Sequence, residues 1–292
     1  VAGWFDLPAP RSTYMVDADG DGALDTLHPG RALSDCTAVA ALHVRFADYE
    51  GINLCFNAAT GPAFGQRSWL SLGDVAREYA ITWMPPGGYA NLSVMEHEMG
   101  HALGLPHSVA PDGDVYGSPW DVMSGGSGPI DTTFGSLAPH TIAAHKQLLG
   151  WIPPERVFVA GPGTSEVIDL ERTAQPPGDG YLMARVPLGD SGRRFYSVEA
   201  RQPVGYDAAI PAAAVLIHAV DWDRGGARLV HADGVGSAAD AGAMWLPGEA
   251  YVDAANGVTV SVLAATPDGF RLEIAVRPRV PFAGCAVQSQ VP

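Results

Sequence analysis

The pattern of hydrophobic and polar positions divides the chain into two parts with different textures. Helix-type and strand-type patterns are mixed up to residue 152, whereas short β-rich runs follow one another at near-regular intervals after it. Pro153 and Pro154 stand between the two parts, and paired prolines cannot continue a helix. The pattern therefore predicts a first domain over residues 1–152, a second over residues 153–280 and a C-terminal tail over residues 281–292.

The second part is predicted to be an all-β sandwich. Turn clusters such as residues 176–178 and 224–226 separate apolar runs that are short enough to be strands. This spacing is typical of two packed antiparallel sheets. The predicted strands cover residues 157–159, 166–170, 181–186, 195–200, 214–220, 258–263 and 270–276.

The first part contains two predicted strands and a predicted helix outside its central motif. Residues 41–46 and 79–84 have the residue types of strands, and the second run stops at a Pro-Pro-Gly-Gly cluster. Residues 137–149 have the pattern of a helix that ends at Gly150. No convincing amphipathic helix is found between residues 46 and 90.

The stretch from Ser93 to His107 organises the first part. Ser93 and Glu96 have the spacing of a capping box, which predicts a helix that begins near Val94. Gly104 predicts its end, because glycine accepts the left-handed conformation common after helices. An apolar stripe at helical spacing is expected to seat this helix in a core, and it consists of Met95, Met99, Ala102 and Leu103.

The polar face of this helix carries the candidate chemistry. His97 and His101 are four residues apart and project from the same side, and the turn at Gly104 brings His107 back toward them. Three neutral imidazoles on Zn²⁺ leave the fourth tetrahedral position to water, as in a catalytic site. Glu98 lies where its carboxylate would take a proton from that water. A single histidine is usually an ordinary surface or core residue, but the five fixed positions of HExxHxxGxxH favour a zinc site.

The motif resembles that of the metzincin clan of zinc peptidases. The clan also has a methionine in a tight turn beneath the metal, and Met123 in Asp121-Val122-Met123-Ser124 fits that role. The resemblance implies an α+β catalytic domain with a twisted sheet, an active-site helix and a C-terminal helix. It also implies a zinc endopeptidase that acts on proteins or peptides, with Glu98 as general base and the substrate backbone bound by an edge strand.

A second, narrower resemblance covers residues 195–221. Their ExRQ and glycine-aromatic-Asp pattern is similar to that of secreted bacterial peptidases of the immune inhibitor A type. Those peptidases have a motif similar to HExxHxxGxxD, with Asp as the third metal ligand. This chain has His107 at that position, and in this it is similar to the gametolysin-like peptidases. Some metzincins have a tyrosine two residues after the turn methionine, and this chain has Gly125 there. A second hydrogen-bond donor for the reaction's oxyanion must therefore come from elsewhere.

An acidic loop near the start of the chain suggests a second kind of metal site. Asp17, Asp19, Asp21 and Asp25 supply carboxylates at a spacing that suits Ca²⁺, with Gly22 at the bend. The alternative is a solvated acidic turn. We expect a structural calcium site of the short DxDxDGxxD type.

The three cysteines allow one short loop to be closed. Cys36 and Cys55 are favoured as a disulfide over two buried thiols. Cys285 is left over, and three interpretations stay open: a packed thiol, an intermolecular partner, or a thiolate that blocks the zinc in a latent form.

The charge of the chain limits its partners. A formal net charge of −15 argues against nucleic acid and anionic membranes, because the long-range field would repel both. No apolar run is long enough to span a bilayer. No signal-peptide pattern opens the sequence, which a cytosolic protein would explain, but an unrestrained zinc endopeptidase would endanger its own cytosol. We therefore expect a secreted protein whose numbering starts at a mature or trimmed terminus. We also expect a monomer.

Two other functions compete with the peptidase. The β-sandwich would be the functional part if the protein were an adhesion or glycan-binding module, with Trp222, Trp245 and Tyr251 as exposed aromatics for stacking on sugars. A metallohydrolase that acts on something other than peptide is the third reading, because HExxH fixes how water is activated and leaves the substrate open.

Overall fold

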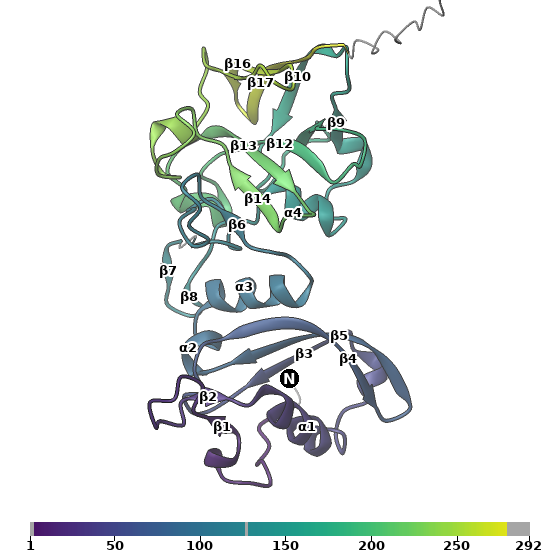
Figure 1. Ribbon diagram of the computed structural model, residues 1–292, viewed down its shortest axis with the longest axis vertical. Coiled ribbons are helices and arrows are strands. Elements are labelled where there is room, and N and C mark those ends of the chain that lie inside the picture. Colours follow the sequence, from purple (N-terminus) through teal and green to yellow (C-terminus); the bar gives the residue numbers. More distant parts are fainter. Residues whose placement is uncertain (1–2, 126–127, 279–292) are drawn as a thin grey trace, which may run out of the picture.

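The computed structural model describes residues 3–125 and 128–278, and the chain there is a mixed α+β protein with many strands and few helices. In Figure 1 the N-terminal part forms the lower half and the C-terminal strands form the upper half, with α3 (Leu92–Ala102) between them. None of the described helices is long and apolar enough to cross a membrane.

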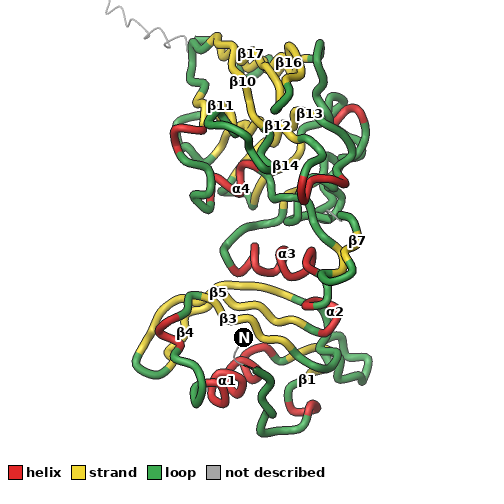
Figure 2. Tube along the Cα trace, turned by 180° about the vertical axis from the view of Figure 1, so that it is seen from behind, coloured by secondary structure: helices red, strands yellow, loops and turns green. Residues whose placement is uncertain are grey.

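A three-stranded sheet forms the centre of the N-terminal part. Its order is β3 (Gly51–Cys55), β5 (Val75–Met84), β4 (Phe64–Leu72), with β5 parallel to β3 and antiparallel to β4. The helix α1 (Pro29–Ala40) packs its buried residues into a hydrophobic cluster with one face of the sheet. Figures 1 and 2 both show α3 across the other face.

Two larger sheets form the C-terminal part. The six-stranded sheet has the order β6-β14-β13-β12-β11-β9, and the four-stranded sheet has the order β10-β17-β16-β15. Side chains from both sheets meet in one hydrophobic cluster. Along β12, alternate residues such as Val198 face this cluster, while Glu199 and Arg201 face the opposite way, toward the segment that follows the histidine motif. The strands are β6 (Ser108–Val109), β9 (Val157–Val159), β10 (Ser165–Glu171), β11 (Met183–Pro187), β12 (Arg194–Arg201), β13 (Ala214–Asp221), β14 (Gly226–Leu229), β15 (Ala250–Asp253), β16 (Val258–Thr266) and β17 (Gly269–Val276).

Residues 108–152 pack on the six-stranded sheet. β6 pairs with β14, and α4 (Ala143–Leu148) shares a hydrophobic cluster with residues of β11, β12, β13 and β14. The domain boundaries at 152 and 280 stay a prediction. The remaining elements are β1 (Met15–Val16), β2 (Thr26–Leu27), α2 (Pro86–Tyr89), β7 (Ile130–Asp131), β8 (Gly135–Ser136) and the 3₁₀ helices Arg11–Thr13, Phe46–Asp48, Pro154–Arg156, Gly205–Ala209 and Ala241–Ala243.

Most predicted strands are confirmed to within a few residues. The run 79–84 lies inside β5, and the seven predicted strands of the C-terminal part correspond to β9, β10, β11, β12, β13, β16 and β17. The strand predicted at 41–46 is wrong, because these residues form the turns after α1 and enter a 3₁₀ helix. The helix predicted at 137–149 is shortened to α4, because the His140 N–H donates to Asp207 and the His140 carbonyl accepts from Arg201, so side chains bond backbone groups that a longer helix would use.

Two further predictions are corrected by the packing. Cys36 and Cys55 are free thiols rather than a disulfide. Cys36 is a residue of α1 and packs against the hydrophobic cluster between this helix and the sheet. Cys55 lies on the exposed side of β3, which faces away from that cluster. The two side chains are therefore on opposite sides of the sheet and do not point toward each other. Trp245 is only 6% exposed, and Trp222 and Tyr251 pack against hydrophobic clusters, so the predicted exposed aromatic surface is not formed.

Candidate metal centre

The helix that carries the motif begins two residues earlier than predicted. α3 starts at Leu92, and its cap residue Asn91 makes no side-chain capping bond. The Leu92 N–H donates instead to the Phe134 carbonyl at 2.9 Å. The capping box of Ser93 and Glu96 is therefore wrong, because a carbonyl from a distant loop satisfies this end of the helix.

The end of α3 and its packing are set by glycines. Gly104 has φ +93°, which confirms the predicted left-handed turn. Gly65 of β4 approaches the Glu98 carbonyl so closely that a Cβ there would overlap it. The expected apolar stripe is wrong in part, since Met99 and Leu103 are 40% and 39% exposed. Close backbone approach to β4 seats this helix, so bulky side chains are not needed.

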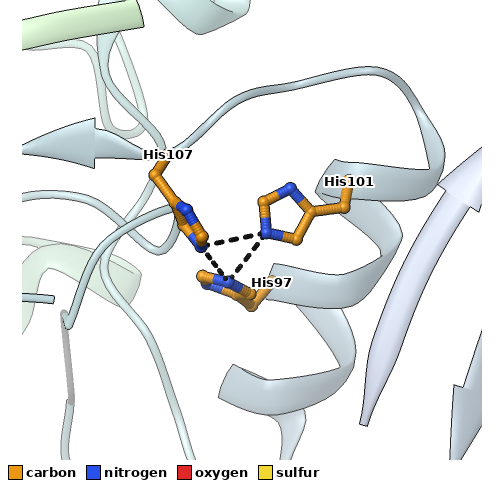
Figure 3. A group of neighbouring side chains, drawn as sticks. All are labelled: His97, His101 and His107. Atoms are coloured by element: carbon orange, nitrogen blue, oxygen red, sulfur yellow. Dashed lines mark hydrogen bonds between the residues drawn. The ribbon is translucent and has the colours of Figure 1, made fainter. Parts of the chain in front are cut away.

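Three imidazoles converge as the motif predicts. The Nε2 atom of His97 lies 3.1 Å from that of His101 and 3.2 Å from that of His107, and the remaining Nε2 pair is 3.1 Å apart. Figure 3 shows the three rings directed at one point, two from α3 and one from the segment after it. Nitrogens bound tetrahedrally to Zn²⁺ at about 2.05 Å lie about 3.3 Å from one another, so the spacing is close to that of a zinc site.

The other ring nitrogens show which tautomer is present. His97 Nδ1 lies 2.7 Å from the Val122 carbonyl oxygen, and His101 Nδ1 lies 2.9 Å from that of Leu105. A carbonyl only accepts, so Nδ1 carries a hydrogen in both rings, and Nε2 is the nitrogen through which each neutral imidazole would bind a metal ion. Burial and the neighbouring histidines lower the pKa of His107 to about 4, which favours its neutral form. Three Nε2 atoms directed at one point are a suitable ligand set for a cation, so the three side chains could hold a divalent metal ion.

Glu98 stands beside this cluster on α3. Burial raises the pKa of its carboxyl, while His101 and the Gly65 amide act in the opposite direction. A carboxylate whose pKa is raised toward neutrality is suited to accept and return a proton.

Met123 lies directly beneath the helix of the motif. It is fully buried, and a Cβ on Gly100 would collide with its sulfur, so the turn and α3 fit together only through glycine. Asp121 holds this turn, because its Oδ1 accepts the Met123 N–H at 3.0 Å and its Oδ2 lies 3.2 Å from His145 Nδ1. The turn then presents the Val122 carbonyl to His97. Met123 therefore lies in a turn packed against α3, next to the residue whose carbonyl contacts His97. Its role as a methionine turn beneath a metal stays a prediction.

The sequence reasoning missed Tyr116. Its ring centroid lies 5.2 Å from that of His107 and 6.2 Å from that of His97, and 59% of the residue is exposed. A Cβ on Gly125 would overlap the Tyr116 carbonyl, so Gly125 lets this loop approach the methionine turn. Tyr116 lies nine residues after the motif in an irregular loop, and no sequence spacing signals its position.

The acidic loop brings only part of the predicted calcium set together. Carboxylate oxygens of Asp17, Asp19 and Asp21 lie within 4.8 Å of one another, and Asp25 is not in this group. Asp17 also accepts the Gly20 and Gly22 amides at 2.7 and 2.9 Å, bonds that an acidic turn makes by itself. The calcium site stays a prediction. Cys285 lies outside the described residues.

No protein-family model matches this sequence, and no curated protein matches it either. The resemblance to metzincin peptidases therefore stays an inference from the motif. The function has to be argued from the geometry of the centre.

Proposed function

We propose that the protein is a zinc-dependent endopeptidase. The observation that carries the proposal is the convergence of three imidazole Nε2 atoms on one point, with the half-buried Glu98 next to His97 on the same helix. Among residues 3–125 and 128–278, no fourth His, Cys, Asp or Glu belongs to this ligand group. Three protein ligands with an open fourth position favour a catalytic over a structural zinc.

The chain's own groups have distinct roles in this proposal. Zinc held by His97, His101 and His107 would lower the pKa of a bound water and polarise the scissile carbonyl. Glu98 takes the proton from the attacking water and returns it to the leaving amine. Val122 and Leu105 keep two of the imidazoles in the required tautomer through their carbonyl oxygens.

The choice of a peptide substrate is supported by β4. Within the described residues this strand pairs only with β5, so no strand covers its other edge. The same strand touches α3 at Glu98 through Gly65. An extended peptide that pairs with β4 would thus run past the general base. A substrate without a peptide backbone would not use this edge.

Other parts of the proposal depend on the sequence alone. They are a metzincin-type first domain, a β-sandwich second domain, calcium in the acidic loop, secretion, and a monomer. Burial of Trp245 removes the main support for a glycan-binding surface.

Tyr116 is proposed to donate its phenolic hydrogen to the oxyanion that forms during hydrolysis. Its ring lies against two metal ligands on an exposed side of the centre. Tyr116→Phe should lower kcat by about 10- to 100-fold with little change in KM, because an oxyanion donor acts mainly in the transition state. Steady-state kinetics on a fluorogenic peptide measure both constants. An unchanged kcat would remove Tyr116 from the mechanism.

The whole proposal is tested by metal removal. Hydrolysis of casein and of a peptide library should stop with a zinc-selective chelator and return when one equivalent of Zn²⁺ is added back. Mass spectrometry of the products identifies internal peptide-bond cleavage. Zinc binding without cleavage of any peptide would exclude the endopeptidase and leave a different hydrolase.

A further inference from the structure

The third histidine is not held by the motif's helix. His97 and His101 belong to α3, whereas His107 follows the Gly104 turn and immediately precedes β6. β6 runs parallel to β14, with Ser108 opposite Ala227 and Val109 opposite Arg228. The residue after the third ligand is thus part of a sheet whose other strands come from residues 157–229.

Gly226 makes the closest contact between β14 and the ligand. Its φ is +137°, and a Cβ there would lie 2.7 Å from the His107 carbonyl oxygen. L side chains rarely adopt such a φ, and the space on that side is taken by the ligand's own backbone. The position of His107 is therefore fixed against a glycine that lies 119 residues later in the chain.

The loop from His107 to Met123 is tied to the same part of the protein at several further points. Arg228 donates to the Pro111 carbonyl at 3.0 Å, and the fully buried Arg201 donates to that of Trp120 at 2.8 Å. The Trp120 indole N–H donates to the Ala238 carbonyl at 2.6 Å. Both ends of the loop belong to the metal centre, and its anchors lie on or beside the six-stranded sheet.

From these contacts we infer that the six-stranded sheet is a positioning element of the metal centre, with Gly226 as the positioning residue for His107. The inference depends on the proposed zinc site. It also means that the histidine motif and its helix are not sufficient for tight metal binding. By thermodynamic linkage, metal binding stabilises the β14 contact as much as that contact favours metal binding.

Adjacent glycines supply a matched pair of variants. Gly225 also has a positive φ, +100°, but a Cβ there would meet nothing within 4 Å. Gly225→Ala and Gly226→Ala therefore share the backbone strain, and only Gly226→Ala presses on the His107 carbonyl. We expect the zinc dissociation constant of Gly226→Ala to rise about 10- to 100-fold relative to Gly225→Ala, the usual effect of removing support behind a ligand.

The experiment measures zinc affinity by chelator competition on the full chain, together with the visible spectrum of the Co²⁺-substituted protein. An altered Co²⁺ spectrum in Gly226→Ala alone reports displaced ligand geometry, which loss of stability by itself would not cause. Equal affinities and spectra for the two variants would overturn the inference. If the unmodified protein itself bound no zinc, the proposed function would fail instead.

Hydrogen exchange on the unmodified protein keeps the inference testable if Gly226→Ala does not fold. Zinc should slow amide exchange in β14 more than in β15, which lies in the other sheet. Equal protection of both strands would contradict a specific link between His107 and β14.

Discussion

Replacing Glu98 with Gln should remove nearly all peptide hydrolysis and leave zinc bound. The amide keeps the size and shape of the carboxylate but has only one acceptor oxygen and cannot take a proton from water. A general base typically contributes about 10²- to 10⁴-fold to the rate, so kcat should fall by that amount. Zinc content is measured by atomic absorption and kcat by hydrolysis of a fluorogenic peptide.

Glu96 offers a matched control on the same helix. Burial raises the pKa of its carboxyl as well, and it lies outside the group of converging ligands. Glu96→Gln should keep kcat/KM within about twofold of the original value, as expected for a change away from the reacting atoms. An active, zinc-replete Glu98→Gln protein would rule out the assigned base.

Replacing Arg201 with Met should destabilise the whole protein strongly. Arg201 is fully buried, and its guanidinium lies 2.7 and 2.8 Å from the two carboxylate oxygens of Asp207. It also donates to the carbonyls of Trp120 and His140. Removing one partner of a buried ion pair costs about 3–5 kcal/mol, so urea denaturation should show a loss of that size in the free energy of unfolding.

An exposed pair of the same type is the control. Arg271 bonds Asp169 through two contacts of 2.8 and 2.9 Å, but both side chains are about half exposed. Arg271→Met should change the free energy of unfolding little, because solvent screens such pairs. Similar losses of unfolding free energy in the two variants would show that burial does not determine how much the Arg201–Asp207 pair stabilises the protein.

The metal centre could be predicted from the sequence because its elements are local. Three motif positions on one helix and a glycine turn place His97, His101 and His107 within eleven residues, and the distances among them agree with convergence. The left-handed turn at Gly104 and the strand β5 were predictable for the same reason. Each depends on residue types that stand close together in the sequence.

Features set by distant contacts could not be predicted. The Phe134 carbonyl replaces the expected capping box, and Tyr116 reaches the centre through an irregular loop. The shortening of the 137–149 helix depends on Arg201, more than fifty residues later. α1 was missed because few of its residues are large and apolar, although its N-terminus has Pro29 and a capping His28. For the start of α3, for Tyr116 and for the shortened helix, the deciding partner is not a sequence neighbour.

X-ray absorption at the zinc edge tests the central claim most directly. On protein loaded with one equivalent of zinc, we predict three imidazole nitrogens and one oxygen at about 2.0–2.1 Å, the signature of a catalytic site with an open position. A sulfur at about 2.3 Å, or a shell with fewer than three imidazoles, would contradict the account.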